Sequence, residues 1–366
     1  MYDNIRPLND SELPQALAQI AASPLLAPIA KFLYPDRDPA LFAKELCAIS
    51  DIHTLQDTVM RAAINRILSL TVTQFTHSGV EKLSPHAPYL FISNHRDITL
   101  DAFLLQYLLF HHNELYITFG ANLMQDPIIS LMGRANRMFR VERGGTPKEF
   151  YHNMSQVSSY IRHVIVSARH SVWIAQRNGR TKDGIDTTEV SLLKMLALSG
   201  RPSRQDPLSP LKALNLVPVS ISYEWEPCDI LKTRELYSRA QGPYRKAPGE
   251  DINSVLTGIL QPKGHVHLAI ADPLSAAEID SCSNTDSPFE NLAALIDRRI
   301  TTGYRLHPTN HLAYDLVHHT THFADHYSPA LKEQFQQRIA SIPDAEKTIL
   351  LDIYSNPVGQ QYPTLI

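Results

Sequence analysis

Apolar residues recur at every third or fourth position over roughly the first 80 residues, with few turn signals between them. This spacing places apolar side chains on one face of a helix, so it predicts helices over 12–34 and 40–72. From about residue 286 to the end, helical spacing returns without any strand signal. Both ends of the chain are therefore expected to be helical.

Between these ends, short apolar runs alternate with helical stretches. The runs lie at 89–94, 115–122, 138–143, 171–177, 216–225 and 265–274. Strands that alternate with helices in this way are typical of an α/β fold. We therefore expect a mixed central sheet with flanking helices over 83–280, an N-terminal helical region over 1–82 and a C-terminal helical region over 281–366.

The composition is that of a globular protein, with 366 residues of which 43% are hydrophobic and 19% charged. Lys and Arg number 34 against 37 Asp and Glu, which gives a formal net charge of −3. A near-neutral chain gives no reason to expect nucleic-acid binding, although it leaves room for a local basic site. Three cysteines without a CxxC pair exclude a disulfide scaffold.

The N-terminal residues lack the basic start and apolar run of a signal peptide. The strongest apolar run, 102–110, is about half as long as a membrane-spanning helix. We therefore expect no signal peptide, no transmembrane helix and a cytoplasmic location.

The segment SNHRDITLD (93–101) directly follows an expected strand and precedes an apolar helix. In open α/β sheets, sites lie beyond the carboxyl ends of strands. A histidine held by a carboxylate can take a proton from a substrate hydroxyl, so His95 is a candidate general base. Asp97 is expected to cap the following helix, and both Asp97 and Asp101 remain candidate partners. The alternative is that both acids only serve the start of the helix.

Cations concentrate in two further segments. RMFRVERGGTPK (137–148) contains Arg137, Arg140, Arg143 and Lys148, and AQRNGRTKDG (175–184) contains Arg177, Arg180 and Lys182 beside Gly179 and Gly184. Guanidinium groups suit phosphate or carboxylate, and glycines let backbone N–H groups approach an anion. We expect the fold to bring both segments to one basic site beside His95. The alternative is a solvated strand end and an ordinary polar loop.

Together with a strand that contains Pro218, these segments resemble the four sequence blocks of the glycerolipid acyltransferase superfamily, which includes bacterial glycerol-3-phosphate and lysophosphatidate acyltransferases. SNHRDITLD resembles the NHxxxxD block, and MFRVER resembles GxxFxxR through Phe139 and Arg143. RNGRTKDG resembles EGGRSRTG through Gly179, Arg180 and Gly184, and VPVSISYE resembles the fourth block. The resemblance covers about 85–275.

The sequence departs from this pattern at three points. Five residues instead of four separate His95 from Asp101, Asn136 stands where glycine is usual, and Arg177 stands where glutamate is usual. Alignment of the leucines that follow favours Asp101 as the partner of His95, with Asp97 as the rival.

The resemblance implies a glycerol-3-phosphate acyltransferase-like fold and an O-acyltransferase of phospholipid biosynthesis. The acyl donor would be acyl-CoA or acyl carrier protein, and the acceptor would be glycerol 3-phosphate or a lysophospholipid. His95 would act as the base and Asp101 would hold its ring. The acceptor phosphate would be bound by Arg143, Arg180, Lys182, Arg177, Arg140 and Asn94. No cofactor or metal is expected, and contact with the inner face of the membrane would be peripheral.

Two alternatives come from other classes of protein. A metal-dependent hydrolase could use His318, His319, His322 and His326, because i,i+4 histidines on a helix can bind zinc. A non-catalytic, lipid-binding homologue would keep the fold without the reaction.

Overall fold

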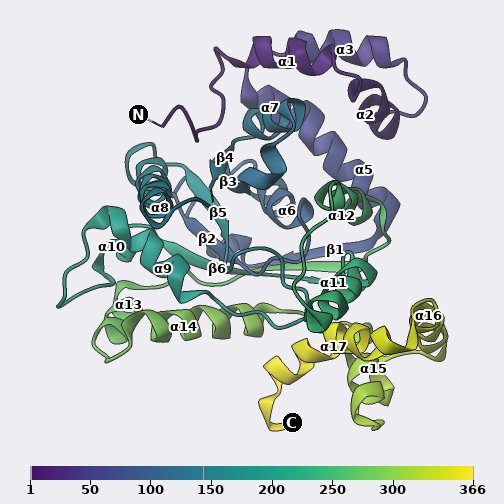
Figure 1. The fold of residues 1–366 in the computed structure, drawn as a ribbon. Coiled ribbons are helices and arrows are strands. Elements are labelled where there is room, and N and C mark those ends of the chain that lie inside the picture. The colour runs from purple at the N-terminus through teal and green to yellow at the C-terminus, as the bar shows by residue number, and fades with distance from the viewer. Residues whose placement is uncertain (1, 143, 366) are drawn as a thin grey trace.

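The computed structural model describes residues 2–142 and 144–365, and its centre is a seven-stranded sheet in the order β1-β7-β6-β2-β5-β3-β4 (Figure 1). Strands β6 and β7 are antiparallel and the other neighbours are parallel. The sheet is therefore mixed, as expected. The strands are Val72–Ser78 (β1), Leu90–Ser93 (β2), Leu115–Gly120 (β3), Met138–Val141 (β4), Ser171–Ala175 (β5), Leu216–Tyr223 (β6) and Gly264–Ile270 (β7).

Helices cover both faces of the sheet, and strand residues alternate between the two cores. Leu90 and Ile92 of β2 face one cluster with helices α8, α9, α10, α13 and α14, whereas Phe91 faces the other with α5 and α6. A central strand that is buried on both faces has apolar side chains at successive positions instead of at every second one. This explains why the strands appear in the sequence as short unbroken apolar runs. The helices are Arg61–Thr71 (α5), Leu100–Leu109 (α6), Pro147–Arg162 (α8), Val190–Ala197 (α9), Ser209–Lys212 (α10), Ala276–Ser283 (α13) and Pro288–Gly303 (α14).

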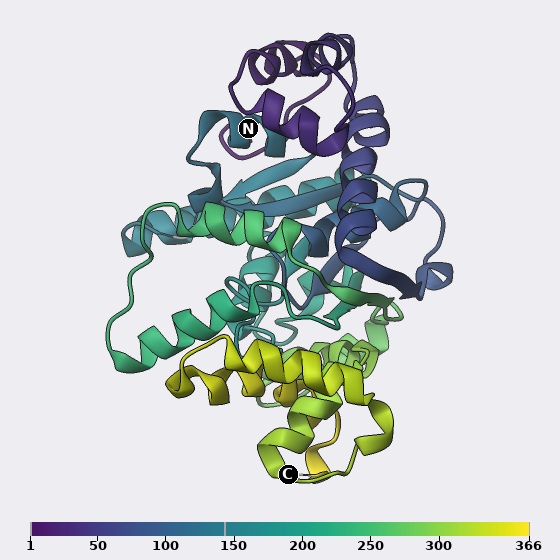
Figure 2. The same cartoon turned by 90° about the vertical axis from the view of Figure 1, so that its right-hand side faces the viewer.

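Two helical groups lie at opposite ends of the molecule (Figures 1 and 2). The N-terminal group forms its own apolar cluster, which includes Ala135 at the end of α7. It consists of Leu13–Ala21 (α1), Leu26–Leu33 (α2), Pro39–Cys47 (α3) and Ile52–Leu55 (α4), and α7 is Pro127–Ala135. The C-terminal group packs around Trp225 and comprises Pro308–His318 (α15), Pro329–Ala340 (α16) and Asp344–Gln361 (α17).

Two features differ from the sequence prediction. Residues 72–78, which we expected to be helical, form β1 and pair in parallel with β7. The stretch between the last two expected strands folds into helices Asp229–Gln241 (α11) and Glu250–Leu260 (α12), which the apolar pattern did not predict. The expected domain boundaries near residues 82 and 280 stay a prediction.

Within the described residues, no single helix is both long and apolar enough to cross a bilayer. Helices α1 and α2 are long and apolar enough for a membrane span only when they are taken together, and they are bent by 91° at their junction.

Candidate active site

The sheet brings three of the four sequence blocks to one edge. Strand β2 lies between β5 and β6 and is parallel to both, so the carboxyl ends of all three strands meet. His95 follows β2, Arg177 follows β5, and Tyr223 ends β6. Loops at this edge of a parallel sheet are the usual place for a site.

His95 and Asp101 are in direct contact across the turn that precedes α6. The Nδ1 atom of His95 lies 2.8 Å from Oδ2 of Asp101. The Asp101 side chain is 1% exposed and the His95 side chain 14%. An ionised carboxylate only accepts hydrogen bonds, so Nδ1 carries the proton and the Nε2 lone pair is free. No described residue forms a hydrogen bond with Nε2.

The carboxylate of Asp101 is held from four directions. Its Oδ2 also accepts from the backbone N–H groups of Arg96 at 2.6 Å and of Asp97 at 3.0 Å. Its Oδ1 accepts from the Tyr223 hydroxyl at 2.6 Å. Burial, followed by the charge of Asp101, raises the pKa of Tyr223 well above its usual value, so the phenol stays a donor. The position and tautomer of the His95 ring are therefore fixed from behind.

Asp97 does not contact His95. Its Oδ1 accepts from the backbone N–H groups of Thr99 and Leu100, both at 2.8 Å, at the start of α6. Its Oδ2 is buried without a partner among the described residues. The side chain therefore serves the beginning of the helix, and Asp101 alone is placed to orient the imidazole.

Asn94 is not available to a substrate, which corrects the expectation that it binds phosphate. It is fully buried, and its amide is occupied on both sides. Its Nδ2 donates to Asp186 and to the carbonyl of Ile221, and its Oδ1 accepts from the N–H of Ile221. It therefore ties β2 to β6, as a buried amide with satisfied hydrogen bonds does.

Arg96 lies in a buried charge network that sequence reasoning missed. Its guanidinium pairs with Asp186 at 2.6 Å and Glu226 at 3.3 Å and lies over the ring of Tyr304. Lys232 bonds to Glu226 and donates to the carbonyl of Arg96 at 2.8 Å. Burial alone would lower the pKa of Arg96. The charges of Asp186 and Glu226 outweigh that effect and raise the pKa well above its usual value. Arg96 stood inside SNHRDITLD, but its buried partners come from distant segments.

The loop after β5 carries two arginines, each with one buried guanidinium nitrogen that has no hydrogen-bond partner. Arg177 Nε and Arg180 Nη1 are buried and have no hydrogen-bond partner, and the described residues form no ion pair with either side chain. Arg180 lines a cavity of about 230 Å³ together with Lys232, Glu235 and Ser254. Buried unpartnered donors of this kind favour an anionic ligand.

The other expected phosphate ligands have partners or lie elsewhere. Lys182 is paired with Glu235, which also pairs with Arg239, and burial lowers the pKa of Lys182. Arg140 is half exposed and pairs with Glu142. Arg143 lies outside the described residues.

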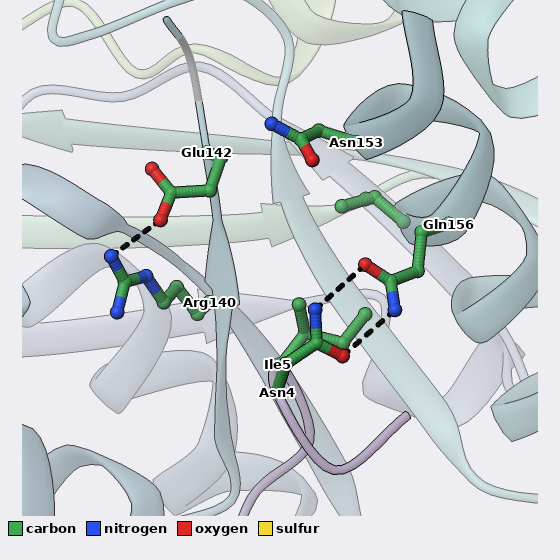
Figure 3. Close-up of a pocket in the computed structure, with 7 residues that line it drawn as sticks. Asn4, Ile5, Arg140, Glu142, Asn153 and Gln156 are labelled. Carbon is green, nitrogen blue, oxygen red and sulfur yellow. Dashed lines mark hydrogen bonds and ion pairs between the residues drawn. The ribbon is translucent and has the colours of Figure 1, made fainter. Parts of the chain in front are cut away.

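Arg140 lines a separate cavity of about 180 Å³ (Figure 3), where Asn4 and Gln156 are hydrogen-bonded to one another. Strand β4, which carries Arg140, is three strands from β2, or about 14 Å at the usual strand spacing. The expectation that one site gathers the cations of both segments is therefore wrong for Arg140. Arg137 points to Glu114 instead, at 2.6 Å.

The remaining block residues have structural surroundings. Phe139 is fully buried in the core, and Pro218 lies within β6 opposite Ile92 of β2. Gly179 and Gly184 have φ of +77° and +81°, which favours glycine. Only Gly184 is closely packed, because a Cβ there would collide with the carbonyl of Ile353.

The histidines at 318–326 do not share a helix face, which corrects the premise of the metal alternative. Helix α15 ends at His318, and His319 has a left-handed backbone with φ of 53°. The chain then turns before a short 3₁₀ segment that ends at His326. Among the described residues, no group of three or more His, Cys, Asp or Glu is arranged to hold a metal ion.

Residues 74–189 match the family model described as Acyltransferase. This segment is therefore similar to the domains of that family. The matched segment contains the His95–Asp101 pair and the loop with Arg177 and Arg180, so the match agrees with an acyltransferase resemblance for this part of the chain. Tyr223 and the C-terminal helices lie outside the matched segment.

Among solved structures, the fold is similar to the crystal structure of the 1-acyl-sn-glycerophosphate (LPA) acyltransferase PlsC from Thermotoga maritima. The two chains are 14% identical with a TM-score of 0.41, over 80% of this chain and 94% of that one. A similarity this weak does not allow functional residues or a substrate to be transferred from that enzyme to the present chain. No curated protein sequence matches the chain at the significance level applied.

Proposed function

We propose that this protein transfers a fatty acyl group from a thioester, acyl-CoA or acyl carrier protein, to a hydroxyl of glycerol 3-phosphate or a lysophospholipid. The observation that carries the proposal is the 2.8 Å contact between His95 Nδ1 and Asp101, which leaves Nε2 free at the carboxyl edge of the sheet. The acyltransferase-family match over residues 74–189 supports the same reaction class.

In the proposed reaction, Nε2 of His95 takes the proton of the acceptor hydroxyl as its oxygen attacks the thioester carbonyl. The carbon–sulfur bond of the resulting tetrahedral intermediate then breaks, and the protonated His95 returns the proton to the leaving thiolate. Asp101 stabilises the imidazolium in between without itself taking the proton. No GxSxG motif occurs in the sequence, which agrees with direct transfer without an enzyme nucleophile.

Arg177 and Arg180 are the proposed ligands of the acceptor phosphate. Both have a buried N–H group without a partner, whereas Lys182 and Arg140 form direct ion pairs with Glu235 and Glu142. A phosphate held by two guanidinium groups fixes the acceptor relative to His95, and such orientation lowers the barrier by up to several kcal/mol.

We also propose that the protein contacts a membrane surface peripherally. Helix α12 exposes Ile252, Leu256 and Leu260, spaced four residues apart, each by more than half of its surface. Leu70 of the adjacent α5 is also exposed. An exposed apolar stripe on a surface helix is typical of interfacial binding. Co-sedimentation with phospholipid vesicles, reduced in Leu256→Asp, tests this contact.

Purified protein incubated with radiolabelled acyl-CoA or acyl carrier protein and a panel of acceptors tests the reaction. We expect transfer to glycerol 3-phosphate or a lysophospholipid, and its loss in His95→Ala. His152→Ala, which changes an exposed histidine on α8, is the matched control. Full activity in His95→Ala would contradict the mechanism, and absence of transfer from every donor would favour a non-catalytic, lipid-binding protein.

A further inference from the structure

The loop that carries Arg177 and Arg180 has no regular secondary structure, yet its end is fixed by the C-terminal helix α17. Gln360 of α17 makes two hydrogen bonds to one backbone unit of this loop. Its Oε1 accepts from the N–H of Asp186 at 2.8 Å, and its Nε2 donates to the carbonyl of Asp186 at 2.9 Å. The side chain of Gln360 therefore bonds both backbone groups of Asp186, as a neighbouring strand would in a sheet.

Two further contacts bring the same helix onto the loop. Asn356 Nδ2 donates to the carbonyl of Asp183 at 2.7 Å. Next to it, Gly184 packs so closely on Ile353 that any Cβ would collide with the carbonyl oxygen of that residue. Ile353, Asn356 and Gln360, which span about two turns of α17, thus contact residues 183–186.

The side chain of Asp186 connects this loop to the residues around His95. Its Oδ1 accepts from the hydroxyl of Thr181 at 2.7 Å, and the backbone N–H of Thr181 donates to the carbonyl of His95 at 2.7 Å. Its Oδ2 accepts from Asn94 at 2.8 Å and from Arg96 at 2.6 Å. The residues on both sides of His95 are therefore bound to an aspartate whose backbone is held by α17.

A second link starts from Tyr354 of the same helix. Its hydroxyl accepts from the N–H of Glu226 at 3.1 Å and donates to Asp229 at 2.7 Å. Glu226 is the other carboxylate of the buried Arg96 network. The helix thereby holds the segment after β6 as well as the loop after β5.

We propose that α17 is part of the acyltransferase site, with Gln360 and Asn356 as positioning residues for the loop that carries Arg177 and Arg180. For its activity readout this inference rests on the proposed function. Short loops without ladder partners lose order readily, and ordering one on each binding event weakens ligand affinity. A loop held in advance by α17 presents its guanidinium groups ready for the acceptor phosphate.

The test compares Gln360→Ala with Gln361→Ala. Gln361 is the matched control, because its Nε2 also makes two hydrogen bonds, at 2.9 Å and 2.7 Å, but to carbonyls of Thr301 and Tyr304 rather than to the loop. Hydrogen exchange of the full-length variants reports the order of 177–188, and steady-state kinetics report KM for the acceptor and the donor separately.

In Gln360→Ala we expect faster exchange at the amides of Thr181 and Asp186. We also expect a fall in kcat/KM for the acceptor of about tenfold or more, mainly through KM, with the donor KM unchanged. Gln361→Ala should show neither change. Asn356→Ala, which removes one hydrogen bond to the loop, should change the same readouts less and serves if Gln360→Ala does not fold.

Unchanged exchange over 177–188 in folded Gln360→Ala and Asn356→Ala would overturn the inference, as would equal losses in Gln360→Ala and Gln361→Ala. If the unmodified protein transfers no acyl group, the proposed function fails. The exchange comparison still decides whether α17 orders the loop.

Discussion

The Tyr223 hydroxyl donates a 2.6 Å hydrogen bond to Oδ1 of Asp101, while His95 lies 2.8 Å from the other oxygen of the same carboxylate. Both Tyr223 and Asp101 are buried. The phenol keeps its proton because burial raises its pKa. The carboxylate therefore cannot rotate away from the imidazole without breaking a short hydrogen bond to a charged acceptor.

Tyr223→Phe removes this hydrogen bond and leaves the ring in place. Since hydrogen bonds to charged groups contribute about 1.5–3 kcal/mol, we expect a comparable loss in the free energy of unfolding and about a tenfold fall in kcat. Urea unfolding and acyl-transfer kinetics measure the two effects. Tyr237→Phe is the control, because its hydroxyl forms no hydrogen bond with a described residue. An unchanged kcat in Tyr223→Phe would show that Asp101 is held well enough without the phenol.

Asp97→Asn and Asp101→Asn separate the two candidate partners of His95. Asparagine at 97 keeps an Oδ1 that accepts from the start of α6, so we expect kcat to stay within about threefold. Asparagine at 101 presents a neutral group to Nδ1 and favours the wrong tautomer, so we expect a loss of about 10³-fold. Acyl-transfer rates measured side by side decide the order. A larger loss for Asp97→Asn would contradict the assignment drawn from the geometry.

Arg177→Ala and Arg180→Ala should each raise the acceptor KM about tenfold, because each removes one charged donor to the phosphate. Arg180→Lys should recover only part of this, since an ammonium lacks the fork of a guanidinium. Arg140→Ala is the control, because Arg140 faces Glu142 in the separate cavity. Equal effects of all three alanine substitutions would mean that the cations act only through the general field of the protein.

Acid should destabilise the protein through His307. Burial lowers the pKa of His307 to about 3, whereas the unfolded chain binds this proton near pH 6.5. The unfolded state therefore gains protons first, and stability falls as the pH drops from about 6.5 towards 3. At pH 5 this one group lowers the free energy of unfolding by about 2 kcal/mol relative to pH 7.

Urea unfolding of His307→Gln at the two pH values checks this. The pH dependence should be smaller by that amount in His307→Gln, whereas His152→Gln, which changes an exposed side chain, should behave as the unmodified protein does. An identical pH dependence in both variants would show that His307 is not the responsible group.

Gly184→Ala and Gly179→Ala differ in one respect only. Both substitutions place a Cβ at positive φ, which costs about 1–2 kcal/mol. At Gly184 the added carbon also meets α17, whereas at Gly179 it meets open space. We therefore expect the larger loss of thermal stability in Gly184→Ala, measured by calorimetry, and equal losses would contradict the close packing.

The sequence predicted the mixed sheet because its strands are short apolar runs between helices. It predicted that Arg177 lies at the same edge as His95, because parallel strands end together, but it did not single out Tyr223. It did not predict β1, since Val72–Ser78 is half polar and continues an amphipathic helix without a break. It also placed Arg140 beside His95, because the spacing along the chain does not say that β4 lies three strands away.

Buried polar networks were the least predictable part. Asp186 has no local pattern that marks it, and its partners come from two distant segments: Asn94 and Arg96 follow β2, and Gln360 lies in α17. The role of Asp97 was anticipated in part, because a carboxylate before an apolar helix is a common cap. Its side chain does accept from the N–H groups of Thr99 and Leu100, but the N-cap position itself is occupied by Thr99. Asn94 was misjudged because a motif position says nothing about whether the side chain faces solvent or the next strand.

Strand β1 pairs only with β7, and Thr76 of β1 lies beside His267 of β7, 191 residues later in the chain. A ribosome that adds about 5–20 residues per second makes this strand wait about 10–40 s for its partner. During that time its backbone N–H and C=O groups are open to other chains, as at any free strand edge. The soluble yield of this protein should therefore depend on whether the unpaired β1 is shielded from other chains during synthesis. A chaperone that binds nascent chains should raise that yield.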